Sequence, residues 1–318
     1  MAAPRKYLDP RILDRLARLD FRARRIVEGS VSGRHRSPYH GFSVEFAEYR
    51  SYAPGDDIKH VDWKAWARGD RYFVKQYEEE TNLDCHILLD CSKSMAYGGG
   101  LAAGMSKFDY GATLTASLAF LLQRQQDAVG TVLFDNDIRT VLPPRSTARQ
   151  VFAIVRALEG CQPDHRSDVD GVFNRLPGQI RRRGVVVLVS DFFLDLGRLE
   201  AMLRQFGHQR HDVVLLHLLH EDEVRFPFPG QTQFKGLETD ERILADASGL
   251  RRDYLAALDD QMRQIRQICS RCRADHLFAH TGMPLDAVLS EYLARRRSAR
   301  RGPAHGGHNP PASGEAAP

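Results

Sequence analysis

Three side chains that bear oxygen stand in a row where an apolar segment of the chain ends. The segment 86–89 is followed by Asp90, Ser92 and Ser94 in an Asp-x-Ser-x-Ser pattern. A short apolar run bounded by polar residues predicts a buried strand, so these side chains lie in the loop that follows it. Alternate residues of an extended segment face the same side. A carboxylate and two hydroxyls on one side are suitable ligands for a hard divalent cation such as Mg²⁺.

Two further loops supply oxygen side chains downstream. Ser167 precedes an apolar helical stretch, and Asp191 follows the apolar run 185–189 through Ser190. Thr147 is an alternative to Ser167, although it begins a different helix. A purely structural interpretation also stays open, because Asp and Ser commonly cap helices and stabilise turns. The three loops together favour a metal site, since one cation accounts for all of them.

The elements that must position these loops alternate regularly after residue 82. Short apolar runs predict strands and amphipathic segments predict helices between them. We expect strands at 87–89, 129–134, 185–189, 213–219 and 275–280, and helices near 107–126, 146–159, 168–176, 197–207, 253–272 and 284–296. This order predicts an α/β fold with a doubly wound, mostly parallel sheet covered on both faces. Such sheets bind ligands at the carboxyl ends of their strands, which is where Asp90 is expected.

The ends of the chain have a different character. Residues 10–28 show an amphipathic helical pattern, and 29–80 are rich in turns, with Trp63 and Trp66 three residues apart. From Arg300 onward the composition is typical of a disordered tail. We therefore predict three parts: residues 1–81 as an N-terminal helix and small β-rich subdomain, 82–296 as the α/β domain, and 297–318 as the tail.

Composition limits the classes of function. The chain has 318 residues, 42% hydrophobic and 27% charged, with a net charge of +4. These values are ordinary for a globular protein, and the arginines at 295–301 have no interleaved aromatic residues, so we expect no nucleic-acid partner. The five scattered cysteines favour reduced thiols, and no apolar run is long enough for a membrane span. We expect a cytoplasmic protein without membrane insertion.

The order Asp-x-Ser-x-Ser, Ser, Asp resembles the metal-ion-dependent adhesion site of von Willebrand factor A-type domains. The resemblance implies that Ser92 and Ser94 bind Mg²⁺, or another hard divalent cation such as Mn²⁺ or Ca²⁺, directly. It implies that Asp90 and Asp191 act largely through bound water, and that Ser167 stands where the family usually has Thr. Neutral hydroxyl ligands leave the ion electrophilic, and an open coordination position can accept a carboxylate from another protein.

The N-terminal half is similar to a bacterial family called domain of unknown function 58. The similarity covers about residues 10–296 and is most specific between Gly33 and Arg68. It is carried, in order, by the segments at 28–30, 33–37, 45–50, 55–57, 61–64 and 67–68. Membership implies the von Willebrand A-like domain and a MoxR-type AAA+ ATPase as partner, without an established activity.

Our leading prediction is a non-catalytic, metal-dependent interaction module that works with such an ATPase in the assembly or remodelling of protein complexes. No catalytic residue is assigned. The alternative is a metal-dependent phosphoryl-transfer enzyme that uses Asp90 as nucleophile, although Ser92 stands where such enzymes need a second acid. A structural subunit that binds no metal is a third possibility. The glycine-rich segment 99–107 lacks the P-loop pattern, and the Cys269/Cys272 pair is expected on a helix, which disfavours zinc.

Overall fold

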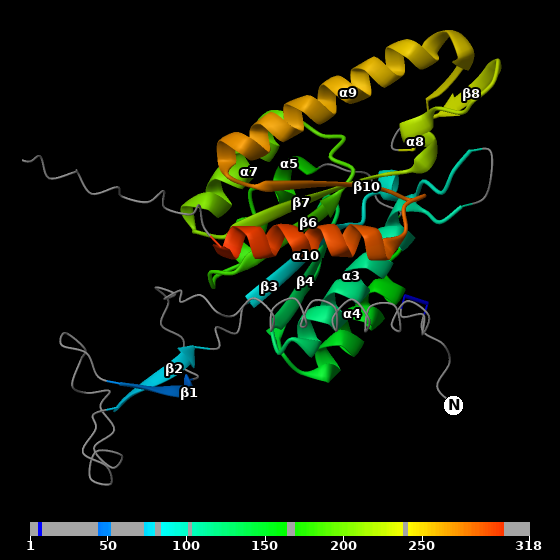
Figure 1. The fold of residues 1–318 in the computed structure, drawn as a ribbon. Helices are drawn as coiled ribbons and strands as arrows, with labels where there is room; N and C mark the ends of the chain where they lie inside the picture. Colours follow the sequence, from blue (N-terminus) through cyan, green and yellow to red (C-terminus); the bar gives the residue numbers. More distant parts are fainter. Residues whose placement is uncertain are drawn as a thin grey trace, which may run out of the picture.

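The computed structural model describes residues 6–7, 44–51, 73–79, 84–100, 104–163, 169–237 and 241–301 (Figure 1). The helix predicted at 10–28, both tryptophans, Ser167 and most of the predicted tail lie outside the described residues. β1 (Val44–Ser51) and β2 (Phe73–Glu79) pair antiparallel within the segment predicted to be β-rich. The predicted boundaries at 81 and 296 stay predictions.

The centre of the molecule is a six-stranded sheet with the order β10-β7-β6-β3-β4-β5. Its strands are β3 (Asp84–Asp90), β4 (Ala128–Phe134), β5 (Ile138–Arg145), β6 (Val185–Ser190), β7 (Asp212–Leu219) and β10 (Asp275–His280). All neighbours pair parallel except β5, which pairs antiparallel with β4 at the edge. The predicted doubly wound α/β fold is therefore confirmed.

Helices cover both faces of this sheet because the strands are apolar on both sides. Neighbouring residues on β3 point to opposite faces, so Leu89 packs toward α3 (Lys107–Arg124), while Leu88 packs toward α7 (Leu196–His208). The face of α3 also carries α4 (Ala148–Gly160) and α10 (Leu285–Arg301). The opposite face carries α5 (Val169–Val172), α6 (Leu176–Gln179) and α9 (Ala247–Cys272). Figure 1 shows these two helical layers with the sheet between them.

Most departures from the predicted elements concern short or polar segments. The helix predicted at 168–176 is divided into α5 and α6, and α9 begins earlier than predicted, with Asp246 accepting a hydrogen bond from the Ser248 amide. The sequence did not predict β5. It also missed α8 (Glu221–Arg225) and the hairpin of β8 (Gln231–Lys235) and β9 (Arg242–Asp246).

The connection order places a switch in strand order between β3 and β6, and the space outside the carboxyl ends of these two strands is called the crevice below. The chain leaves β3 for β4 on one side and later returns to β6 on the other side, so the helices that follow these strands diverge to opposite faces. Ligand sites of open α/β sheets lie at such a switch in strand order, outside the carboxyl ends of the strands. Asp90 ends β3 and Ser190 ends β6. Asp90 and Asp191, two of the sequence-predicted site residues, therefore lie at the carboxyl ends of neighbouring strands.

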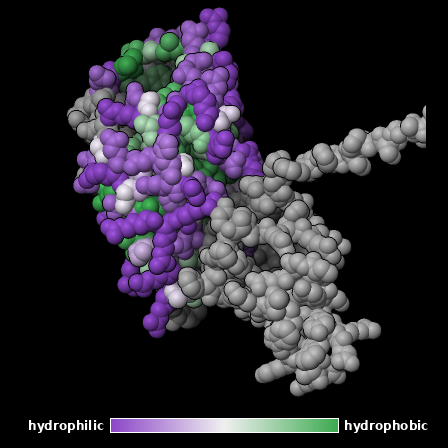
Figure 2. Space-filling view, turned by 90° about the vertical axis from the view of Figure 1, so that its left-hand side faces the viewer, coloured by the Kyte–Doolittle hydropathy of each residue, from purple (hydrophilic) through white to green (hydrophobic). Residues whose placement is uncertain are grey.

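The opposite end of the sheet has a different surface. Figure 2 shows the side where α7 and α9 end, and hydrophilic residues dominate it, with apolar residues in separate areas between them. Arg204 and Arg271 both pair there with Glu200, at 2.7 and 2.8 Å. Among the described helices, none is both long and apolar enough to cross a membrane.

Candidate metal centre

Asp90 is held at the end of β3 by hydrogen bonds to both of its carboxylate oxygens. The Ser190 hydroxyl donates to Oδ2 at 2.7 Å, and the Ser92 amide donates to Oδ1 at 2.8 Å. The residue is only 4% exposed. One bond crosses from β6 and the other closes the loop after β3. Asp90 thus fixes the geometry of the loop and also brings negative charge to the crevice.

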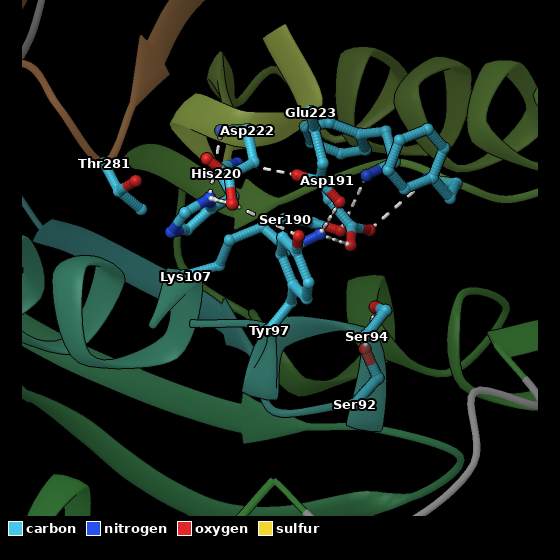
Figure 3. Close-up of polar contacts among 12 residues, drawn as sticks. Ser92, Ser94, Tyr97, Lys107, Ser190, Asp191, His220, Asp222, Glu223 and Thr281 are labelled. Carbon is cyan, nitrogen blue, oxygen red and sulfur yellow. Dashed lines mark hydrogen bonds and ion pairs between the residues drawn. The ribbon is translucent and has the colours of Figure 1, made fainter. Parts of the chain in front are cut away.

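Ser92 and Ser94 present their hydroxyls side by side. Their Oγ atoms are 3.0 Å apart, and Figure 3 shows both side chains below Asp191. Ser92 precedes the short 3-10 helix η2 (Lys93–Ala96), but its hydroxyl caps no backbone amide of that helix. The simple capping interpretation therefore does not account for this hydroxyl. Two adjacent hydroxyls can both reach one hard cation.

Asp191 follows β6 and faces the same crevice. Its Oδ2 accepts a hydrogen bond from the Lys107 ammonium at 2.8 Å, and its Oδ1 accepts one from the Phe193 amide at 3.3 Å. The Ser94 hydroxyl helps to lower the pKa of this carboxylate. The alternative role of Asp191 as a helix cap is wrong, because Asp195 performs it by accepting from the Arg198 amide at 3.0 Å.

The turn after Asp191 has an unusual backbone conformation. Phe192 has φ 53°, in the left-handed region that non-glycine residues seldom adopt, although its side chain is fully buried. Gln261 of α9 donates to the Phe192 carbonyl at 3.1 Å. Such a conformation persists where surrounding contacts impose it. Here it lets Phe192 enter the core while Asp191 remains turned to the crevice.

Lys107 and Glu223 complete the polar centre, and the sequence analysis did not assign either to it. The Lys107 side chain is 1% exposed, and its ammonium also bonds to Glu223 Oε1 at 2.7 Å (Figure 3). Glu223 belongs to α8, where its Oε2 accepts from the His220 amide at 2.6 Å in a capping box. The sequence did predict that Lys107 begins a helix. It gave no sign of Glu223, which lies 116 residues away.

The electrostatics of the crevice are unbalanced. Burial, and secondarily the nearby Asp191, raise the pKa of Asp90 to about 6. Burial also opposes the ionisation of Asp191, but Lys107 outweighs it and holds that pKa below its ordinary value. Burial raises the pKa of Glu223, whereas the two carboxylates raise that of Lys107 against its burial. Negative charge in excess of the single ammonium would be relieved by a further cation.

These donors fit a hard divalent cation. Two hydroxyls and the carboxylates of Asp90 and Asp191 converge from the ends of β3 and β6, and oxygen donors of this kind suit Mg²⁺. Within the described part of the chain there is no group of three or more His, Cys, Asp or Glu residues that could hold a metal, so a site here depends on the hydroxyls. Thr147 precedes α4, as predicted. The contribution of Ser167 stays a prediction.

Comparisons with known proteins gave one family and relatives without an assigned function. The model of the family described as "Protein of unknown function DUF58" matches residues 48–264. Uncharacterised proteins of Mycobacterium bovis and Mycobacterium tuberculosis are each 26% identical over 296 residues, which is 91% of this chain and 91% of theirs.

The solved structures that match the chain share little sequence with it. The conserved hypothetical protein BatB from Bacteroides thetaiotaomicron is 13% identical, with a TM-score of 0.46, over 68% of this chain and 99% of that one. An aerotolerance-related membrane protein from Bacteroides fragilis is 15% identical, with a TM-score of 0.48 and the same coverage. The VWA domain of SpRpn10 is 11% identical, with a TM-score of 0.40, over 66% of this chain and 94% of that one.

Proposed function

The chain belongs to the DUF58 family, whose description assigns no activity, and we propose from its site that the protein is a non-catalytic, metal-dependent interaction module. The cation is Mg²⁺ or another hard divalent ion such as Mn²⁺ or Ca²⁺. It is held by Asp90, Ser92, Ser94, Ser167 and Asp191. The open coordination position accepts a carboxylate of a partner protein.

One observation carries the proposal. The Ser92 and Ser94 hydroxyls lie 3.0 Å apart beside two buried carboxylates, at the switch in strand order of the sheet. Hydrogen bonds already occupy both oxygens of Asp90, which suits contact with the ion through water. The same bonds and the 4% exposure of Asp90 disfavour a nucleophilic attack by this carboxylate, so the proposal includes no catalytic step.

The surroundings of the crevice support docking of a protein. Phe193, two residues after Asp191, is 43% exposed, and Met105, two residues before Lys107, is 47% exposed. Large apolar side chains next to a charged centre are common at protein interfaces. The resemblance to the family suggests that a MoxR-type AAA+ ATPase is one partner, and that the pair acts in the cytoplasm in the assembly or remodelling of protein complexes.

Binding of Mg²⁺ by the purified protein tests the proposal. Isothermal titration should detect one site per chain, and Ser92→Ala and Asp90→Ala should each weaken binding by on the order of ten-fold or more, because each removes a donor or its support. Thr115→Ala serves as a matched control, because it removes a buried hydroxyl of α3 eight residues after Lys107 that is not among the proposed ligands. Capture of partners with Mg²⁺ and with a chelator then tests docking.

Unchanged Mg²⁺ affinity and unchanged partner capture in both site variants would refute the proposed site. Turnover of a generic aryl phosphate that disappears in Asp90→Asn would favour phosphoryl transfer instead. Tight capture of the partner in excess chelator, equal to that in Mg²⁺, would favour a structural subunit.

A further inference from the structure

The charged groups of the crevice have a definite formal sum. Asp90, Asp191 and Glu223 contribute three carboxylates, and Lys107 contributes one ammonium, which leaves two negative charges. Asp222 of α8 is left out of this sum, because its Oδ2 accepts from the Gly100 amide at 2.9 Å and from the Tyr97 hydroxyl at 3.4 Å and does not contact Lys107. His220 is buried, and burial lowers its pKa, so its ring is neutral near pH 8. A divalent cation neutralises this sum.

Lys107 contributes to that sum in a fixed way. It is the first residue of α3, after the capping Ser106, and its ammonium is within 2.8 Å of Asp191 and 2.7 Å of Glu223. The rest of its side chain is enclosed, so the charge cannot turn to solvent. The Asp191 carboxylate thus interacts with the Lys107 ammonium and, in the proposed site, also with the ion bound beside Ser94.

We propose that Lys107, with Glu223 as its partner, sets the net charge of the crevice at minus two and so determines that the site takes a divalent cation. Lys107 is a specificity-determining residue and not a ligand. This inference rests on the proposed metal site, and it adds the reason why the charge of the bound ion is two. Coulomb energies are large at partly buried sites. The Lys107 ammonium lies 2.8 Å from the carboxylate of a proposed ligand, so its charge should have a measurable effect on metal affinity.

A simpler account gives the Lys107–Glu223 ion pair only a structural role, as a strut, meaning a contact that holds α3 against α8. The two accounts differ for single variants. A strut is broken equally by Lys107→Met and by Glu223→Gln, so both variants should lower metal affinity together. Charge setting predicts opposite effects, because the first variant changes the sum to minus three and the second changes it to minus one. The double variant restores minus two without the pair.

The experiment measures affinities for Mg²⁺ and for Tb³⁺ at pH 8 in the full chain, with unfolding curves in chelator and in metal. Lys107→Met should bind Mg²⁺ on the order of ten-fold more tightly than the wild type, and its preference for Tb³⁺ should increase more. Glu223→Gln should bind Mg²⁺ on the order of ten-fold more weakly, and the double variant should return close to wild type. Lys107→Met should also regain in Mg²⁺ the stability that it loses in chelator.

Each other result overturns the inference. Equal losses of affinity in both single variants identify a strut, and unchanged affinities show that the pair does not affect the ion. If Lys107→Met does not fold, a weaker Glu223→Gln with a restored double variant still supports charge setting, and a double variant as weak as Glu223→Gln contradicts it. Absence of Mg²⁺ binding in the wild type overturns the proposed site as well, and this result is distinct from the others.

Discussion

Asp90 is under two opposing requirements, one from stability and one from binding. It supports the loop after β3 through two hydrogen bonds, yet its charge is buried close to that of Asp191. A buried carboxylate with a raised pKa reduces the stability of the folded state at neutral pH, since its ionised form is penalised there. The presence of a destabilising carboxylate at this position is more simply explained if Asp90 helps to bind a cation than if it serves folding alone.

Asp90→Asn should therefore stabilise the metal-free protein at pH 8, by about 1–3 kcal/mol. The folded-state pKa of Asp90, about 6, lies above the ordinary value of 3.8, so the wild type gains stability relative to the variant as the pH falls through 6. The difference should close near pH 4. Denaturant unfolding in chelator between pH 4 and pH 8 measures it. A variant that is less stable by the same amount at every pH would contradict this explanation.

At the scale of elements, the strands that could be predicted from the sequence are those made of continuous apolar residues. The ends of β4, β6 and β7 were predicted within one residue, and those of β3 within three. β5 was missed because it is half exposed and contains Pro143 and Pro144. Proline disfavours a central strand but is tolerated at an edge, and β5 is an edge strand. The hairpin of β8 and β9 has only five residues in each strand, too few for a clear alternation.

Two aspartates near the start of α7 have separate functions that a variant pair can distinguish. Asp195 caps the helix, so Asp195→Ala should lower the free energy of unfolding by about 1 kcal/mol and leave Mg²⁺ affinity unchanged. Asp191→Ala should remove most of the affinity, because it takes a carboxylate from the crevice and leaves Lys107 in it. Unfolding curves in chelator and titrations with Mg²⁺ measure both. Equal losses of affinity in the two variants would show that the loop acts as one unit.

At the scale of the whole molecule, the decisive contacts join distant parts of the chain. Ser190 and Asp90 are 100 residues apart, and Lys107 and Glu223 are 116 apart. The convergence of the first pair could be predicted, because the carboxyl ends of parallel strands meet at one edge of a sheet. The second pair could not, because α8 follows no strong apolar pattern and the sequence alone does not tell which acid a lysine meets. Ser167, predicted from its motif, lies outside the described residues.

The start of the chain is tied to the α/β domain by Tyr7, which bears on the predicted division at residue 81. Tyr7 is 3% exposed, and its hydroxyl donates to Asp109 Oδ1 at 2.8 Å on α3. Tyr7→Phe should cost about 1 kcal/mol of unfolding free energy through the lost hydrogen bond, and Tyr7→Ala about 3 kcal/mol through the lost packing as well. Lys6→Ala is the control, because the Lys6 ion pair with Asp109 is exposed and should contribute little. If Tyr7→Ala were as stable as the wild type in denaturant, the buried contact of Tyr7 with α3 would contribute nothing to the stability of the α/β domain. If it is destabilised as expected, Tyr7 contributes to the packing of α3, the same helix whose first residue, Lys107, reaches the metal centre.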